Sequence, residues 1–356
     1  MIRVLIVEDS AVVREFLSHV LSSDPEIEVV GAARDGEEAV EFARQKKPHV
    51  ITMDIAMPRM DGFEATRRIM ESFPTPIIVV SASSDAWEIE RTFRAMEAGA
   101  VAVLPKPRGR GRPGHDLQVQ ELIQTVKLMS EVKVVKRWPR RGEVFIRSQR
   151  PEIAIAPTAV KIETVAIGAS TGGPVPIQTI LSNLPADFPA AVLIVQHIAS
   201  GFAPGFVEWL ADSSRLPVRL ASDGEQIENG CAYVAPDEHH MGVRSDRRIE
   251  LNRDAPENGM RPAVSYLFRS VAKACGSTAV GVLLSGMGKD GAGELRLMRD
   301  AGAITFAQDE ASTVVYGMPG EAARLGAAVH SLPPEQIAAA LASLVNEARK
   351  RGEKRT

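Results

Sequence analysis

A serine lies between glycines directly after an apolar run, in the segment VAIGASTGGP at residues 165–174. The motif G-x-S-x-G, after a predicted strand and before a helix expected to begin near Pro174, is the context of a nucleophile elbow. Its glycines would permit a sharp turn, and the helix N-terminus would stabilise developing negative charge. Ser170 is therefore a candidate nucleophile. Glycine-rich turns of this kind also bind phosphates and dinucleotides, so the motif alone leaves a dinucleotide site open.

Two later apolar runs also end in groups that could take part in catalysis. AAVLIVQHI (190–198) ends in Gln196 and His197, where a dinucleotide site would need an acid about 20 residues after the glycines. VGVLLSGMGKDGAG (280–293) leads into a glycine-rich loop that carries Asp290. If the strands are parallel, Ser170, His197 and Asp290 share one sheet edge, and together they are the parts of an acyl-transfer triad. A structural histidine and a helix-capping aspartate are the alternatives.

A second set of polar residues follows the apolar runs near the N-terminus. Glu8, Asp9 and Asp54 supply carboxylates, and Ser81 and Lys106 follow the next two runs. Carboxylates placed together repel unless a cation lies among them, and oxygen ligands without His or Cys favour Mg²⁺. An aspartate nucleophile, a metal, a hydroxyl and an ammonium would suit a phosphoryl group. Asp54 could instead cap the turn before MPRMDG.

These residues need sheets that bring the ends of the apolar runs together. Apolar runs alternate with helical spacings along residues 1–131, which predicts a doubly wound parallel sheet of five strands. The same alternation resumes after Lys161 and predicts a second α/β unit with a mostly parallel sheet. The predicted strands are IRVLIV, IEVVGA, HVITM, PIIVVS and AVAVL in the first half and TVAIG, AAVLIVQHI, CAYVAP, AVGVLLSG and AITFAQ in the second.

Length and composition set the domain count and class. A chain of 356 residues with 45% hydrophobic and 24% charged residues predicts two globular domains. We place them at 1–131 and 161–350, joined by a basic linker at 132–160 that is either a solvated tether or an anionic docking site. A net charge of −3 gives no pull toward nucleic acid. No signal peptide or uncharged run of 18 apolar residues is found, so we expect a cytoplasmic protein without membrane insertion.

The first 130 residues resemble a response-regulator receiver domain through VLIVEDS, MDIAMPRMDG, VVSAS and LPKP. The resemblance implies a flavodoxin-like sheet of order 2-1-3-4-5 and phosphorylation of Asp54 by a histidine kinase. It also implies Mg²⁺ bound with the help of Glu8 and Asp9, and sensing of the phosphoryl group by Ser81 and Lys106. Val103 stands where receivers usually have an aromatic residue, which puts the aromatic part of their switch in question.

The second half resembles the catalytic domain of chemotaxis protein-glutamate methylesterases, the CheB family, through IGASTGGP, LIVQHI, YVAPDEHH, SGMGKDGAGEL and VVYGMPGEA. The resemblance implies that Ser170 attacks the methyl ester of a glutamate, His197 transfers the proton and Asp290 orients the imidazole. The N–H groups of Thr171 and Met287 would stabilise the oxyanion. The implied substrate is the methylated cytoplasmic helices of chemoreceptors, with glutamine deamidation as a second activity. We expect no esterase cofactor, and a monomer.

Three residues depart from the family pattern, and two other classes of function stay open. Ala263, Ser265 and Ser285 stand where the family commonly has Ser, Asp and Thr, and we expect none of them to contact the triad. His239 and His240 are expected to be structural or to contact substrate, because a metal site would need more ligands. The alternative functions are a receiver-controlled binding protein without catalysis and a dinucleotide-dependent enzyme. A DNA-binding regulator is disfavoured because the basic residues lie in a linker.

Overall fold

The computed structural model describes residues 1–81, 86–109, 111–112, 114–132, 134 and 160–352. The chain divides into two compact units, Met1–Ser148 and Gln149–Thr356. Each is described by itself. Nearly all of the linker predicted at 132–160 falls outside the described residues, so its role stays a prediction.

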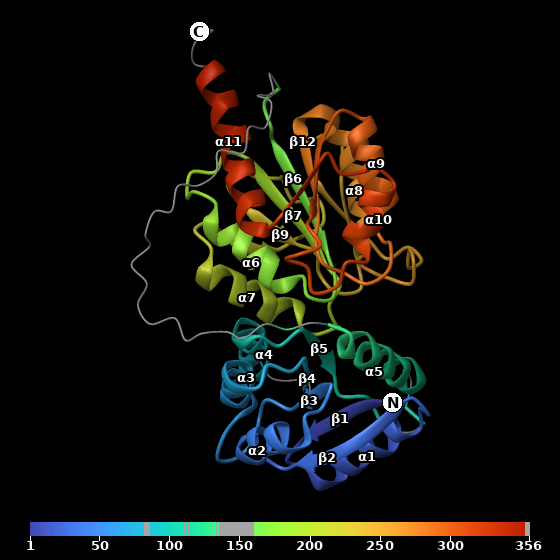
Figure 1. Cartoon of the computed structure of the whole chain (residues 1–356). Coiled ribbons are helices and arrows are strands. Elements are labelled where there is room, and N and C mark those ends of the chain that lie inside the picture. The colour runs from blue at the N-terminus through green and yellow to red at the C-terminus, as the bar shows by residue number, and fades with distance from the viewer. Residues whose placement is uncertain (82–85, 110, 113, 133, 135–159, 353–356) are drawn as a thin grey trace. The chain divides into compact units, whose positions relative to one another are not determined.

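The first unit is a five-stranded parallel sheet of order β2-β1-β3-β4-β5, as predicted. Helices α1 and α5 cover one face and α2, α3 and α4 the other (Figure 1). The helix predicted at 115–131 is α5, His115–Ser130. The other bounds are β1 Ile2–Val7, α1 Ala11–Ser22, β2 Ile27–Ala33, α2 Gly36–Lys46, β3 Val50–Met53, α3 Gly62–Ser72, β4 Ile77–Ser81, α4 Ala86–Ala98 and β5 Ala102–Pro105.

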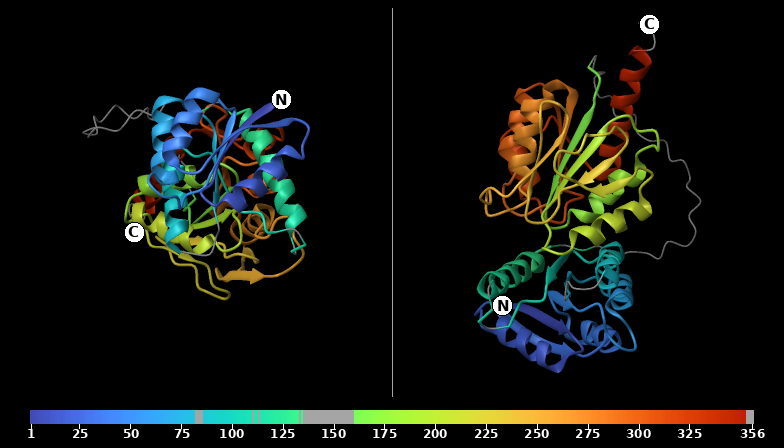
Figure 2. Two further views of the ribbon diagram at one scale, coloured as in Figure 1. Left: turned by 90° about the horizontal axis from the view of Figure 1, so that it is seen from below. Right: turned by 180° about the vertical axis from the view of Figure 1, so that it is seen from behind.

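The second unit is a seven-stranded parallel sheet of order β14-β13-β12-β6-β7-β9-β8. Helices α6, α7 and α11 lie on one face and α8, α9 and α10 on the other (Figures 1 and 2). The strands are β6 Thr164–Ala169, β7 Ala191–Gln196, β8 Val218–Leu220, β9 Ala232–Val234, β12 Ala279–Leu283, β13 Ile304–Gln308 and β14 His330–Leu332. The helices are α6 Pro174–Asn183, α7 Ala203–Ser213, α8 Val264–Cys275, α9 Ala292–Asp300, α10 Met318–Arg324 and α11 Pro334–Gly352.

Most of the strands that the sequence predicts are buried, although the predicted edge strand β2 is only partly buried. Every residue of β6, β7 and β12 is buried, because a parallel strand covered by helices on both faces reads as a continuous apolar run. The prediction missed β8 and β14, which have three residues each, are only partly buried and lie at the sheet edges. It also missed the antiparallel pair β10 (His240–Val243) and β11 (Ile249–Asn252).

None of the helices in the described ranges combines the length and the apolar composition that a membrane span requires.

Candidate functional sites

The central strand of the second sheet places Ser170 between the two other predicted triad members. Strand β6 pairs in parallel with β7 on one side and β12 on the other. In this register Ala169 is opposite Gln196, so Ser170 and His197 are the next residues beyond two neighbouring strand ends. Asp290 lies in the loop after β12. The three residues therefore gather at the carboxyl edge, as predicted.

The turn that carries Ser170 is held by hydrogen bonds within the turn and to residues at the ends of both neighbouring strands. Its N–H donates to the Ser285 carbonyl at 2.9 Å, and its carbonyl accepts from Gly173 N at 2.9 Å. The side-chain amide of Gln196 donates to the carbonyls of both Ser170 and His197, at 2.8 Å each. The left-handed residue of the turn is Gly172, with φ 76°, whereas Ser170 itself does not have a positive φ. The strained serine conformation of a nucleophile elbow is therefore not found here.

A glycine lets the loop after β12 pack directly behind the serine. A Cβ at Gly286 would lie 2.8 Å from the Ser170 Cβ and 2.2 Å from the Met318 sulfur, so no side chain fits there. The Gly286 N–H donates to the Val315 carbonyl at 3.1 Å, and its carbonyl accepts from Met318 N at 2.9 Å. The segment VVYGMPGEA thus fixes the glycine-rich loop against the turn that carries Ser170.

His197 and Asp290 form a buried pair. Nε2 of His197 lies 2.9 Å from Oδ2 of Asp290. Nδ1 of His197 is buried and, within the described part of the chain, has no hydrogen-bond partner. Buried polar atoms in folded proteins are nearly always paired, so an unpaired imidazole nitrogen beside the serine's strand indicates a group kept for another partner.

Asp290 accepts hydrogen bonds from backbone and side-chain donors on both oxygens. Oδ2 accepts from Val264 N at 2.7 Å in addition to His197. Oδ1 accepts from Ser265 N at 3.2 Å, Asn258 Nδ2 at 3.0 Å and the Ser265 hydroxyl. Burial alone would raise the pKa of Asp290, but the bonds from His197, Ser265 and Val264 outweigh it and lower the pKa to about 2. Asp290 is therefore an ionised acceptor at neutral pH.

The expectation that the departures from the family pattern leave the triad untouched is wrong for two of three residues. Ser265 binds Asp290 through both its backbone N–H and its hydroxyl. The Ser285 carbonyl accepts from the N–H of Ser170, and its hydroxyl donates to the Thr171 carbonyl at 2.8 Å. Sequence spacing could not reveal these contacts, because 25 and 115 residues separate Ser265 from Asp290 and Ser170 from Ser285 along the chain.

The predicted oxyanion donors lie on the two loops that meet at the serine. Thr171 follows Ser170 directly, and Met287, which is about half exposed, follows Gly286. Their backbone N–H groups donate to no other described residue. They stay predicted donors.

The two neighbouring histidines have structural contacts. His239 Nδ1 lies 2.8 Å from the Asp237 carbonyl, and its Nε2 accepts from Arg253 at 3.0 Å. His240 is fully buried and contacts backbone groups of Ala255 and Ala263. Among the described residues, the group that could hold a metal contains neither of them.

That group is the acidic cluster at the carboxyl edge of the first sheet. Glu8, Asp9 and Asp54 each offer a carboxylate oxygen, and these oxygens lie within 4.8 Å of one another. Lys106 Nζ is 2.9 Å from both Glu8 Oε2 and Asp54 Oδ2. Ser81 is buried at the end of β4, and its carbonyl accepts from Lys106 N at 2.8 Å. The structure thus brings together all five predicted residues.

The electrostatics of this cluster leave negative charge uncompensated. Burial, and next the charge of Asp54, raise the pKa of Glu8 to about 7 against the opposing effect of Lys106. Burial also raises the pKa of Asp54, although Lys106 and the Ile55 N–H, at 2.8 Å, oppose it. One ammonium does not neutralise three carboxylates. The cluster could therefore hold a divalent cation.

Comparisons with known proteins agree with both units. The family model for CheB methylesterase matches residues 165–341, and that for the response regulator receiver domain matches residues 4–112. Protein-glutamate methylesterase/protein-glutamine glutaminase 4 of Geobacter metallireducens is 57% identical over 348 residues, covering 98% of this chain and 100% of that protein. The protein of the same activities from Nitrosospira multiformis is 54% identical, covering 98% of each chain. The crystal structure of the Thermotoga maritima CheB methylesterase catalytic domain superposes with a TM-score of 0.51 at 35% identity, covering 52% of this chain and all of that one.

Proposed function

The chain belongs to the CheB methylesterase family, and we propose that it is a phosphorylation-activated hydrolase of glutamate methyl esters in chemoreceptors. The names of its relatives supply the substrate class, a protein glutamate methyl ester, and a second one, protein glutamine. The observation that carries the proposal is the buried His197–Asp290 pair, with its unpaired nitrogen, on the strand beside that of Ser170.

The pair determines which nitrogen acts as the base. Asp290 is ionised and can only accept, so Nε2 of His197 carries the hydrogen between them. Nδ1 is then the nitrogen with the free lone pair, and it takes the proton of Ser170 as the hydroxyl oxygen attacks the ester carbonyl carbon. The protonated imidazole, stabilised by Asp290, returns that proton to the departing methoxide, and methanol leaves. The same base then activates a water molecule, which attacks the acyl-enzyme. This step releases the glutamate side chain and regenerates the Ser170 hydroxyl.

The tetrahedral intermediates need donors for the oxyanion. We assign this role to the N–H groups of Thr171 and Met287, which have no other partner among the described residues. Thr171 lies three residues before the N-terminus of α6, whose positive end favours negative charge. Losing one such donor costs about 10²- to 10³-fold in rate in other acyl-transfer enzymes.

The same groups can act on a glutamine side chain. Attack of Ser170 on the carboxamide gives the same acyl-enzyme, with ammonia leaving in place of methanol. This assigns protein-glutamine deamidation to the same site.

In the receiver, we assign Asp54 as the acceptor of a phosphoryl group from a histidine kinase. Mg²⁺ would be held by Glu8, Asp9 and Asp54. Their carboxylate oxygens lie close together and the pKa of Glu8 is raised, as is expected of a site that binds a cation. Mg²⁺ neutralises phosphoryl oxygens when bound. Lys106, now paired with Asp54, would pair with the phosphoryl group, and Ser81 would donate its hydroxyl to it. Position 103 in β5 is a partly buried valine, so a phosphorylation switch in this receiver would have to operate without an aromatic side chain there.

The remaining assignments follow the same reasoning. We place the receiver at 1–131, the linker at 132–160 and the esterase at 161–350; the two family matches fall within these bounds. We also propose that the chain is a monomer, and that it acts in the cytoplasm, where the receptor's cytoplasmic helices would be its substrate.

The decisive experiment is methanol release from methylated chemoreceptor cytoplasmic fragments. Wild type and Ser170→Ala are compared with and without a small-molecule phosphodonor and Mg²⁺. Ser170→Ala should lower kcat by about 10⁴- to 10⁶-fold, as expected for the loss of a triad nucleophile. Wild-type release should rise when phosphodonor is added.

Each other outcome contradicts one part of the proposal. Full release by Ser170→Ala would exclude the triad. No release by wild type from several receptors would favour a receiver-controlled binding protein. Release that ignores the phosphodonor would leave the esterase and exclude the switch.

A further inference from the structure

The two oxygens of Asp290 have different partners. Oδ2 faces His197 at 2.9 Å, whereas Oδ1 faces Asn258 and Ser265. An orienting carboxylate can present one oxygen to its histidine only if rotation about its own side-chain bonds is prevented. The bonds to Oδ1 supply that restraint.

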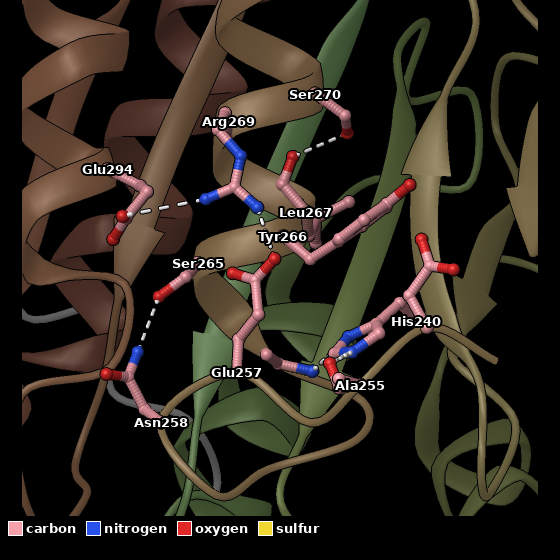
Figure 3. Close-up of polar contacts among 12 residues, drawn as sticks. His240, Ala255, Glu257, Asn258, Ser265, Tyr266, Leu267, Arg269, Ser270 and Glu294 are labelled. Carbon is pink, nitrogen blue, oxygen red and sulfur yellow. Dashed lines mark hydrogen bonds and ion pairs between the residues drawn. The ribbon is translucent and has the colours of Figure 1, made fainter. Parts of the chain in front are cut away.

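The donors to Oδ1 form a closed network of their own. Asn258 Nδ2 donates to Asp290 Oδ1 at 3.0 Å and to the Ser265 hydroxyl oxygen at 3.1 Å. That hydroxyl donates its hydrogen to Asp290 Oδ1 and accepts from Gly291 N at 3.2 Å. Figure 3 shows the Asn258 amide pointing at Ser265 on the first turn of α8. Ser265 is buried and Asn258 is exposed. The two acceptors of the Asn258 amide are hydrogen-bonded to each other, so they share one of its N–H groups, and these linked bonds restrain the Asp290 carboxylate.

The first turn of α8 adds the remaining restraint. Ala263 precedes the helix and has no side-chain oxygen to cap it. Asp290 supplies the missing cap from another loop, because it accepts from Val264 N at 2.7 Å and Ser265 N at 3.2 Å. The positive end of the helix dipole also favours the ionised carboxylate.

The loop that carries Asn258 is anchored independently of Asp290. His240 Nε2 donates to the Ala255 carbonyl at 3.1 Å, and its Nδ1 accepts from Ala263 N at 3.3 Å, so one buried imidazole holds both ends of the loop (Figure 3). The ring stacks on Tyr266 with centroids 4.9 Å apart. Asn258 has a left-handed backbone, φ 52°, which asparagine tolerates. The amide is thus presented to Asp290 by a held backbone.

From this arrangement we propose that Asn258 and Ser265 are positioning residues of the esterase, which fix the Asp290 carboxylate so that Oδ2 is presented to His197. They touch no reacting atom in the mechanism above. The inference rests on the proposed triad.

The test measures kcat and KM for methanol release in single and double variants of the full chain. Asn258→Gly removes the amide and keeps a left-handed backbone accessible. It should lower kcat roughly 10- to 100-fold with KM unchanged, the cost of a misplaced catalytic group. Asn258→Asp places a second carboxylate beside Asp290 and should lower kcat further. Ser265→Ala should lower kcat within the same range as Asn258→Gly.

Two further variants separate positioning from a general structural role. In an Asp290→Asn background, Asn258→Gly should change kcat less than about twofold, because a residue that acts through Asp290 has nothing left to position. Glu257→Gln breaks the pair between Glu257 and Arg269, which ties the same loop to the same helix (Figure 3). Exposed ion pairs contribute little in water, so kcat should stay within about twofold of wild type.

The outcomes distinguish this inference from the triad itself. A wild-type kcat for Asp290→Asn would contradict the triad. A large loss for Asp290→Asn together with a normal kcat for Asn258→Gly would contradict only the positioning role. An equal loss from Asn258→Gly in both backgrounds, or an equal loss from Glu257→Gln, would assign Asn258 a structural role and overturn the inference.

Discussion

Each of the two parallel sheets presents a buried aspartate at its carboxyl edge, yet the surroundings of Asp54 and Asp290 are opposite. Asp54 lies among carboxylates, with one lysine between them, and burial raises its pKa. Asp290 accepts hydrogen bonds on both oxygens, and its pKa is about 2. The same topology therefore supports two kinds of carboxylate.

The difference lies in what completes each site. Both oxygens of Asp290 accept hydrogen bonds from protein groups, which keep it ionised. Its charge can therefore orient and stabilise an imidazolium. The acidic cluster has fewer such donors, so a cation is needed to offset the repulsion between its carboxylates. An under-compensated carboxylate is suited to accept a metal and a phosphoryl group, whereas a saturated one is suited to hold a neighbour in place.

The most direct test of this difference is to replace each aspartate in turn by asparagine. Asp290→Asn should lower kcat for methanol release by about 10³- to 10⁴-fold, because the amide favours the wrong imidazole tautomer. Its phosphorylation by a small-molecule phosphodonor, measured by intact-protein mass spectrometry, should match wild type. Asp54→Asn should take up no phosphoryl group and give the same esterase rate with and without phosphodonor, losing an activation of about 5- to 150-fold.

A crossed result would contradict the separation of roles. If Asp290→Asn also failed to be phosphorylated, or if Asp54→Asn still responded to phosphodonor, the two carboxylates would not have the distinct functions that their surroundings indicate.

The fold could be predicted from the sequence where buried strands appear as continuous runs of apolar residues. Strands β3 and β4 of the receiver and β6, β7 and β12 of the esterase read as apolar runs, because both faces of each strand are covered. The short edge strands β8 and β14 are only partly buried and gave no such run. The candidate groups at strand ends followed from the fold, since parallel strands bring their carboxyl ends to one edge.

The supports of the site could not be predicted in the same way. Asn258 lies in a loop, and Ser265 lies on the first turn of α8. Neither follows a strand, and each reaches Asp290 only through tertiary packing. The sequence expectation that Ser265 leaves the triad untouched failed for this reason. Gly286 is a related case, because the sequence indicated a glycine-rich loop but not that this loop packs against Ser170.

The acidic cluster should make the stability of the receiver depend on pH. The pKa of Glu8 is raised from 4.5 to about 7 by folding, so the folded chain binds a proton that the unfolded chain releases. Stability due to this group is fully present below pH 4.5 and is lost as pH rises through 7, by about 3 kcal/mol. Protection factors for β1 amides in hydrogen exchange should fall over this window in wild type and much less in Glu8→Gln. Saturating Mg²⁺ should reduce the fall. An identical fall in Glu8→Gln would assign the change to another group.

The matching test on Asp290 should show a smaller effect with the opposite sign. Folding lowers the pKa of Asp290 from 3.8 to about 2, so the unfolded chain binds the proton first. Stability from this group is present above pH 3.8 and is lost as pH falls through 2, by about 2 kcal/mol. Trp209 is buried in α7, so with Trp87 and Trp138 replaced by Phe its fluorescence reports urea unfolding of the second unit. The free energy of unfolding should drop between pH 4 and pH 2, and Asp290→Asn should flatten that drop. If the two curves stay parallel, the carboxylate is not held ionised by its donors, and the contrast with the acidic cluster disappears.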